Sequence, residues 1–224
     1  MMTVGLYTCF RHGDPTHYLH GASLVRDVRR EMPGVAVAHL TDADSPSLPW
    51  VDRVERLPAG PLLERRIEHY AAHDGDWLFL DTDIELCGDV RGVFADPYFD
   101  VALTDRDWPH LTQPARLIEE MPYNTGVVFS RSRAFWSEVL ATWRDGSPDQ
   151  RADWLSEQRA VAHVARSGRY RVRVLSGMAY NYPPSSGDDP RWAAIRHYKG
   201  RRKVWLTRRI YTAARQAQMV PACV

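Results

Sequence analysis

Short apolar segments alternate with segments of helical periodicity through the first half of this 224-residue chain. Residues 4–10, 35–40 and 77–80 are rich in the apolar and β-branched side chains typical of buried strands. Between them, residues 18–31 and 61–72 carry apolar side chains at helical spacing. This alternation favours right-handed crossover connections between parallel strands. The sequence therefore predicts an α/β fold, a single domain built on a mainly parallel central sheet.

The second half of the chain continues the pattern with weaker signals. We expect further strands over residues 99–104, 124–130 and 170–175, and helices over residues 132–143 and 151–167. A basic amphipathic helix is expected over residues 204–218. Its apolar residues are spaced to pack one side of the helix on the domain: Val204, Leu206, Ile210, Tyr211 and Ala214. We expect one domain over residues 1–224 that ends in this helix.

The composition excludes several classes of protein. The formal net charge is only +1, so no strong overall field points to nucleic acid or to a membrane. Cys9, Cys87 and Cys223 form neither a disulfide framework nor the spacing of a metal site. The apolar run over residues 4–10 is too short to span a bilayer, and no leader peptide precedes it. These features predict a cytoplasmic protein without a membrane span.

An acidic turn, Asp81-Thr82-Asp83, follows directly after the apolar run at residues 77–80. Ligands of parallel sheets collect beyond the carboxyl ends of the strands. Residues two apart in extended backbone project to the same side, so both carboxylates can converge on one cation, which would offset their mutual repulsion. Hard oxygen ligands suit Mg²⁺ or Mn²⁺ bridging a diphosphate. The turn is therefore a candidate site for a divalent cation and a nucleotide.

An acidic turn after an apolar strand resembles the signature of the GT-A glycosyltransferases, which have a Rossmann-like fold. Further segments are similar to the retaining family 8, the glycogenin and bacterial galactosyltransferase group, and they occur in that family's order. Residues 123–129 resemble the strand that lines the sugar pocket, which implies that Asn124 binds the donor and that Gly126 permits close approach. Residues 157–158 stand where the family carries Asp-Gln, and residues 180–182 resemble its Asn-Tyr element near the acceptor.

The segment over residues 197–205 resembles the family's C-terminal His-x-x-Gly-x-x-Lys-Pro-Trp element. It departs from that element only at Val204, which stands in place of the Pro. This is the longest of the matching segments, and it lies at the expected place in the chain. It adds an imidazole and a lysine to the acidic turn.

The resemblance implies a role for each member of these two segments. His197 is expected to complete a metal site with Asp81 and Asp83, while Asp81 also contacts the ribose. Gly200 is expected to let the backbone approach the diphosphate. Lys203 is expected to neutralise charge on the leaving nucleotide and so to contribute to catalysis as well as to donor binding.

Other residues are candidates for the sugar and nucleotide ends of the site. The resemblance implies that Gln158 lies on the face of the sugar where transfer occurs and that Glu157 contacts a sugar hydroxyl. Thr8 and Phe10, at the end of the first strand, and Arg66, on the helix that opens at Pro61, are positional candidates for contact with the nucleotide.

The function that follows is a Mn²⁺- or Mg²⁺-dependent transfer of a hexose from a nucleotide-diphosphate sugar, expected to be a UDP-sugar, to an acceptor hydroxyl with retention. An inverting enzyme with Asp153 or Glu157 as base remains an alternative. The basic stretch over residues 196–215 allows a nucleic-acid binder, which would leave the paired aspartates unexplained because carboxylates repel phosphates. A transferase that acts on a DNA or other polyanionic acceptor is the third alternative.

Overall fold

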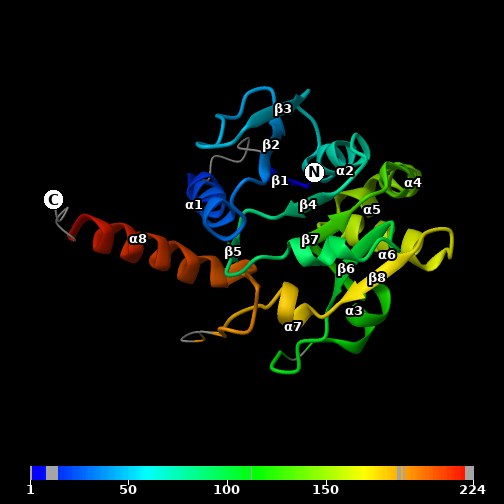
Figure 1. Ribbon diagram of the computed structural model, residues 1–224. Helices are drawn as coiled ribbons and strands as arrows, with labels where there is room; N and C mark the ends of the chain where they lie inside the picture. The colour runs from blue at the N-terminus through cyan, green and yellow to red at the C-terminus, as the bar shows by residue number, and fades with distance from the viewer. Residues whose placement is uncertain (1, 9–14, 112, 186–187, 189, 220–224) are drawn as a thin grey trace.

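A seven-stranded sheet in the order β3-β2-β1-β4-β7-β6-β8 forms the centre of the molecule (Figure 1). The computed structural model describes residues 2–8, 15–111, 113–185, 188 and 190–219, with the backbone alone for 216–219. The strands are β1 (Thr3–Thr8), β2 (Ala36–Asp42), β3 (Arg53–Leu57), β4 (Trp77–Leu80), β5 (Ile84–Leu86), β6 (Val101–Asp105), β7 (Tyr123–Ser130), β8 (Val172–Leu175) and β9 (Ile195–His197).

Helices cover both faces of this sheet. They are α1 (Pro15–Glu31), α2 (Leu62–Ala71), α3 (Ala115–Glu120), α4 (Arg133–Asp145), α5 (Pro148–Ala152), α6 (Ser156–Arg166), α7 (Gly177–Tyr180) and α8 (Lys203–Met219), with 3-10 turns η1 (Arg91–Ala95) and η2 (Gly200–Arg202). Within the described residues, no helix is both long and apolar enough to cross a membrane.

The central sheet is mainly parallel, and this confirms the predicted fold class. Strand β7 is the exception, because it runs antiparallel to both of its neighbours, β4 and β6. The reversal has a direct consequence for the site. The first residues of β7 lie at the same edge of the sheet as the last residues of β4 and β6. Asn124 is thereby brought to the edge at which Asp81 begins its turn.

Side chains of β4 alternate between two hydrophobic layers, as expected for a strand buried on both faces. Leu78 and Leu80 pack on the face covered by α1, together with the short strands β5 and β9. Trp77 and Phe79 pack on the opposite face, which α2, α4 and α6 cover. The four-residue strand is therefore held from both sides, and the acidic turn that follows it starts from a fixed position.

The helix predicted over residues 151–167 is interrupted, so that prediction was wrong in its continuity. Helix α5 ends at Ala152 and α6 begins at Ser156. At the break, the carboxylate of Asp153 accepts the backbone N–H of Leu155 at 2.9 Å, which offers the chain a turn in place of a helical hydrogen bond. As a result, Glu157 lies in the first turn of α6 and faces the interior.

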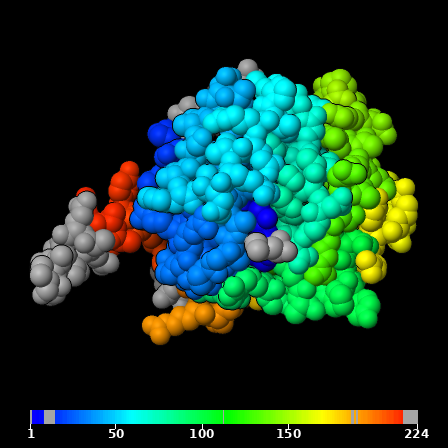
Figure 2. Space-filling view, turned by 45° about the horizontal axis from the view of Figure 1, so that its top comes forward, coloured from blue at the N-terminus to red at the C-terminus, as the bar shows by residue number. Residues whose placement is uncertain are grey.

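The predicted packing of the C-terminal helix holds for only part of its apolar residues. Leu206 and Ile210 pack beside Tyr198 and are buried, but Val204 is 46% exposed and Tyr211 58% exposed. The expectation failed for these two because the buried side of α8, with Leu206 and Ile210, packs beside Tyr198 and α1, and Val204 and Tyr211 lie outside that contact. Beyond that contact, the helix extends away from the rest of the molecule (Figures 1 and 2).

Two buried histidines predict a loss of stability in acid. Burial lowers the pKa of His39 and of His69 to about 4, from an ordinary value of 6.5. Between pH 6.5 and about pH 4, the two imidazoles therefore bind protons in the unfolded chain but stay neutral in the folded chain. The folded state loses stability relative to the unfolded state as the pH falls through this window. Each histidine is expected to cost about 2 kcal/mol between pH 7 and pH 5.

Urea denaturation of His39→Gln at the two pH values measures this effect. The variant is expected to lose about 2 kcal/mol less than the natural chain between pH 7 and pH 5. His163→Gln, at an exposed position on α6, is the matched control and should keep the full loss. An acid loss of the same size in His39→Gln would contradict the assignment.

Candidate active site

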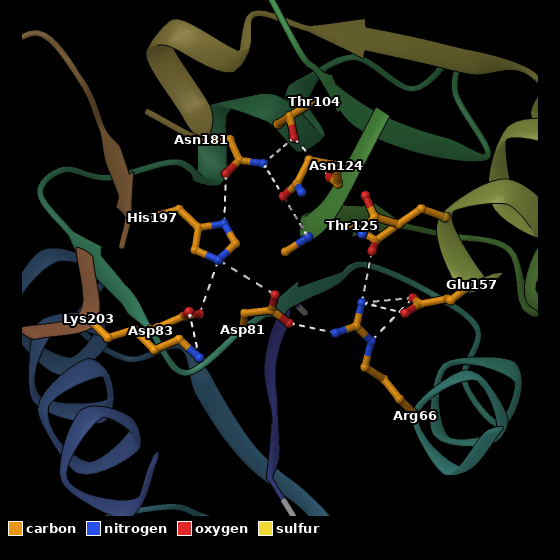
Figure 3. Close-up of polar contacts among 12 residues, drawn as sticks. Arg66, Asp81, Asp83, Thr104, Asn124, Thr125, Glu157, Asn181, His197 and Lys203 are labelled. Carbon is orange, nitrogen blue, oxygen red and sulfur yellow. Dashed lines mark hydrogen bonds and ion pairs between the residues drawn. The ribbon is translucent and has the colours of Figure 1, made fainter. Parts of the chain in front are cut away.

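Three potential metal ligands converge at the carboxyl edge of β4 (Figure 3). Nε2 of His197 lies 3.1 Å from Oδ1 of Asp83 and 3.6 Å from Oδ2 of Asp81. One ligand atom from each of the three residues lies within 4.8 Å of the others. Two carboxylates and one imidazole form a donor set suited to a divalent cation such as Mn²⁺.

The pairing of two short strands brings the histidine to the acids. Strand β9 pairs antiparallel with β5, and in this register His197 lies opposite Ile84. The backbone N–H of Tyr198 also donates to the carbonyl of Asp83 at 2.8 Å. The acidic turn is thus held between the end of β4 and the start of β5, directly against the histidine.

A buried network of amides fixes the orientation of the imidazole. Nδ2 of Asn181 donates to Oδ1 of Asn124 at 2.9 Å and to Oγ1 of Thr104 at 2.6 Å. The other amide atom of Asn181, Oδ1, therefore accepts from Nδ1 of His197 at 2.9 Å. When Nδ1 donates its proton to Asn181, Nε2 is left to coordinate a cation held by the two aspartates, so the residues present fit a metal site.

Gly126 on β7 allows the imidazole of His197 to lie close to the strand. A Cβ at this position would stand 2.1 Å from Cε1 of His197 and 2.9 Å from Oδ2 of Asp81. Only a residue without a side chain leaves room for both groups. The close approach that the sequence suggested at Gly126 is therefore made by the chain's own imidazole.

Arg66, on α2, joins two carboxylates at the other side of the acidic turn. Its guanidinium donates to Asp81 at 2.8 Å, to the hydroxyl of Thr125 at 2.8 Å and to Glu157, with the closest N–O distance 2.7 Å. Burial raises the pKa of Glu157, although the charge of Arg66 opposes this shift. The ion pairs hold Asp81 on one side and anchor the first turn of α6 on the other.

Lys203, at the start of α8, places a positive charge beside the acidic turn. Its Nζ lies 3.2 Å from Oδ2 of Asp83. Burial disfavours the charged form of Asp83, but with no cation bound, the positive charge of a protonated His197 and of Lys203 outweighs this effect and holds the pKa of Asp83 below the usual range. Asp83 is therefore an anion throughout the physiological pH range.

These groups line one side of a pocket of about 400 Å³. Most of the residues predicted for the site contribute to its walls: Thr8, Arg66, Asp81, Asp83, Asn124, Gln158, His197, Gly200 and Lys203. Glu157 is only 2% exposed and its carboxylate is directed to Arg66 and Thr125 instead. The predicted contact at Phe10 lies outside the described residues.

Two basic residues of the pocket, Arg106 and Lys199, were missed by sequence reasoning. Arg106 follows β6, and burial lowers its pKa to about 10, so it stays charged at neutral pH. Burial, with the charge of Arg106, lowers the pKa of Lys199 well below its ordinary value. Lys199 stands between His197 and Gly200 in the C-terminal motif, and this position is a usable signal. Arg106 offers no signal beyond its place at a strand end.

No protein-family model matches this sequence, and no curated protein matches it either. The structure, however, is similar to solved glycosyltransferases. It matches the galactosyltransferase LgtC, solved with donor and acceptor sugar analogues, at 12% identity and a TM-score of 0.60, over 99% of this chain and 98% of that one.

Two further structures give the same result. A glycosyltransferase involved in glycosylation of the major capsid of PBCV-1 matches at 16% identity and a TM-score of 0.62, over 94% of this chain and 98% of that one. The glycosyltransferase GlyE of Streptococcus pneumoniae TIGR4 matches at 11% identity and a TM-score of 0.66, over 100% of this chain and 66% of that one. The chain therefore has the GT-A fold, which confirms the resemblance predicted from its sequence at the level of the fold.

Proposed function

We propose that this chain, which has the fold of the GT-A glycosyltransferases, transfers a hexose from a nucleotide-diphosphate sugar to an acceptor hydroxyl with the help of a divalent cation. UDP is the nucleotide that the family resemblance favours. The observation that carries the proposal is the convergence of Asp81, Asp83 and Nε2 of His197 within 4.8 Å, at the wall of a pocket. These residues come from distant parts of the chain and meet at the carboxyl end of β4, the edge at which parallel sheets collect their ligands.

The main energetic requirement of the transfer is to stabilise negative charge on the departing diphosphate. In transfer, the bond between the anomeric carbon and a diphosphate oxygen breaks, and the electron pair remains on the diphosphate. The acceptor oxygen bonds to the anomeric carbon, and its proton passes to the diphosphate. A bound divalent cation supplies Lewis-acid stabilisation of the diphosphate charge. Lys203 adds a positive charge at the same place, and Gly200 leaves the backbone open to close approach.

The distribution of carboxylates supports retention of the anomeric configuration. Among the described residues that line the pocket, the carboxylates are Asp81 and Asp83, both at the proposed metal site. Asp153 pairs with Arg159 outside the pocket, and Glu157 is committed to Arg66. An inverting enzyme needs a base opposite the leaving group. We therefore favour attack from the face of the departing diphosphate, with Gln158 beside the reacting carbon.

The basic C-terminal helix does not favour a polyanionic acceptor over a small one. Arg209 is engaged with Glu85 at 2.9 Å, so one of its cations is already neutralised. Arg208 is exposed, but the described part of α8 has no row of aromatic side chains on which a single-stranded nucleic acid could stack. A titration with duplex DNA at low and moderate salt distinguishes the two kinds of acceptor. Binding that weakens steeply with salt would favour a DNA acceptor.

Hydrolysis of the donor tests the proposed function without knowledge of the acceptor. A panel of UDP-, GDP- and ADP-hexoses is incubated with the protein and Mn²⁺, and the released nucleotide and sugar are measured. One or more donors are expected to be consumed, with a hexose released in the anomeric form of the donor. Consumption that survives metal chelation, or absence of consumption across the panel, would contradict the proposal.

Lys203→Ala is expected to lower kcat by tenfold or more while changing donor affinity much less. Negative charge on the diphosphate grows as the bond breaks, so the lysine stabilises the transition state more than the bound donor. A tenfold effect corresponds to about 1.4 kcal/mol, the scale of one charge-assisted contact. Steady-state kinetics of donor hydrolysis measure it, and a raised KM with unchanged kcat would reduce Lys203 to a ground-state contact.

A further inference from the structure

One end of the pocket carries positive charge that the chain does not neutralise. The side chain of Arg106 is buried, with 7% of the residue exposed, and donates to the carbonyl of Tyr123 at 3.2 Å and to Oε1 of Gln158. Within the described part of the chain it has no carboxylate partner. A buried guanidinium is normally paired, because the loss of hydration is costly. The Arg106 guanidinium is therefore available to bind an anion from outside the chain.

Lys199 lies at the same end and is also incompletely satisfied. Its Nζ is buried and finds no hydrogen-bond acceptor among the described residues. It lies 3.7 Å from the centroid of the Trp108 ring, while Cζ of Arg106 lies 5.9 Å from the same centroid. An aromatic face offsets only part of the lost hydration of an amine. Two nitrogen donors thus flank one indole, and both line the pocket.

The contrast with Arg66 shows that this arrangement is specific to one end of the pocket. Arg106 is buried, the side chain of Arg66 is only 11% exposed, and both arginines line the pocket. Arg66 is neutralised by Asp81 and Glu157, whereas the side-chain hydrogen bonds that Arg106 makes to described residues go to neutral oxygens, those of a backbone carbonyl and of Gln158. The charge of Arg66 is thus used within the protein. The charge of Arg106 lies beside Gln158, the residue expected at the reacting carbon.

We propose that the acceptor of this enzyme carries an oxyanion, a carboxylate or a phosphate, which Arg106 and Lys199 bind while its hydroxyl lies beside Gln158. This inference rests on the proposed function and names the class of its second substrate. A guanidinium forms paired hydrogen bonds to either oxyanion, and a nearby amine adds a third donor. The anion serves only as a binding group and takes no part in the exchange of bonds at the anomeric carbon.

Matched pairs of acceptors test the proposal. With a donor that the protein hydrolyses, transfer is measured to glucose, glucuronic acid and glucose 6-phosphate, and to glycerol, glyceric acid and glycerol phosphate. At least one charged member is expected to be used with a kcat/KM tenfold or more above its neutral partner. The carboxylate and phosphate arms then identify which oxyanion the site prefers. Arg106→Gln and Lys199→Met are each expected to reduce this charged-to-neutral ratio toward one.

The ratio separates acceptor binding from general damage to the site, because any loss common to both substrates cancels. Arg201→Gln removes one positive charge two positions from Lys199, at an exposed residue, and should leave the ratio unchanged. Equal kcat/KM values for charged and neutral acceptors would overturn the inference. It would also be overturned if the charged compounds accepted no hexose and did not inhibit donor hydrolysis. If Arg106→Gln lost affinity for UDP and the natural chain showed no preference for charged acceptors, Arg106 and Lys199 would belong to the donor site and the inference would be overturned. Absence of donor hydrolysis in the natural chain would instead count against the proposed function.

Discussion

Asp83→Ala is expected to lower donor hydrolysis about a thousandfold or more. Asp83 contacts both His197 at 3.1 Å and Lys203 at 3.2 Å, so it joins the proposed metal site to the lysine that we propose faces the diphosphate. Loss of the cation removes several kcal/mol of stabilisation from the departing diphosphate, and each 1.4 kcal/mol or so is a factor of ten in rate. Single-turnover hydrolysis at saturating Mn²⁺ measures the change in the chemical step.

Asp89→Ala is the matched control for this prediction. Asp89 lies six positions further along the chain, pairs with Arg91 and is half-exposed. The Asp89→Ala substitution therefore removes the same charge at a position outside the pocket. Its hydrolysis rate should equal that of the natural chain. A decrease of less than tenfold in Asp83→Ala, with normal folding by circular dichroism, would show that the acidic turn does not hold the catalytic cation.

Arg66→Met is expected to destabilise the fold by about 3–5 kcal/mol, as measured by urea denaturation. The substitution leaves Glu157, only 2% exposed, without the guanidinium that compensates its burial. Double replacement with Arg66→Met and Glu157→Leu removes both charges and should recover most of this stability. It should not recover donor hydrolysis, because Asp81 still lacks the partner that holds it at 2.8 Å.

Arg144→Met provides the surface comparison. Arg144 on α4 also contacts two carboxylates, Glu64 and Glu68, but its side chain is 48% exposed. A surface pair of this kind contributes about 1 kcal/mol or less. A double variant as unstable as Arg66→Met alone would show that α6 depends on Arg66 for packing and not on charge compensation.

Local patterns were sufficient to predict most of the fold. The helices and strands of the first half follow hydrophobic periodicity, and the acidic turn follows from its place after β4. The interruption between α5 and α6 was not predicted, because Asp153 and Ser156 act through side-chain contacts that periodicity does not register. The antiparallel course of β7 also escaped prediction, since an apolar strand reads the same in either direction.

The candidate site was predictable only where a motif supplied long-range information. His197 is separated from Asp83 by 114 positions, and the two meet through strands of three residues that no local pattern distinguishes from loop. The C-terminal motif identified His197 all the same. Glu157 was assigned a sugar contact because its partner Arg66, 91 positions away, could not be seen from the sequence. The roles of the predicted site residues remain predictions for the experiments above.

Calorimetry of UDP binding with and without Mn²⁺ tests the proposed metal site. We propose that Asp81, Asp83 and His197 bind a cation that in turn binds the diphosphate. UDP should therefore bind at least tenfold more tightly with Mn²⁺ than with a chelator, and uridine, which lacks the diphosphate, should show no dependence on the metal. The same experiment with Asp83→Ala should show weak UDP binding under both conditions. Binding of UDP that is equally tight with chelator, or that is unchanged by Asp83→Ala, would contradict the account.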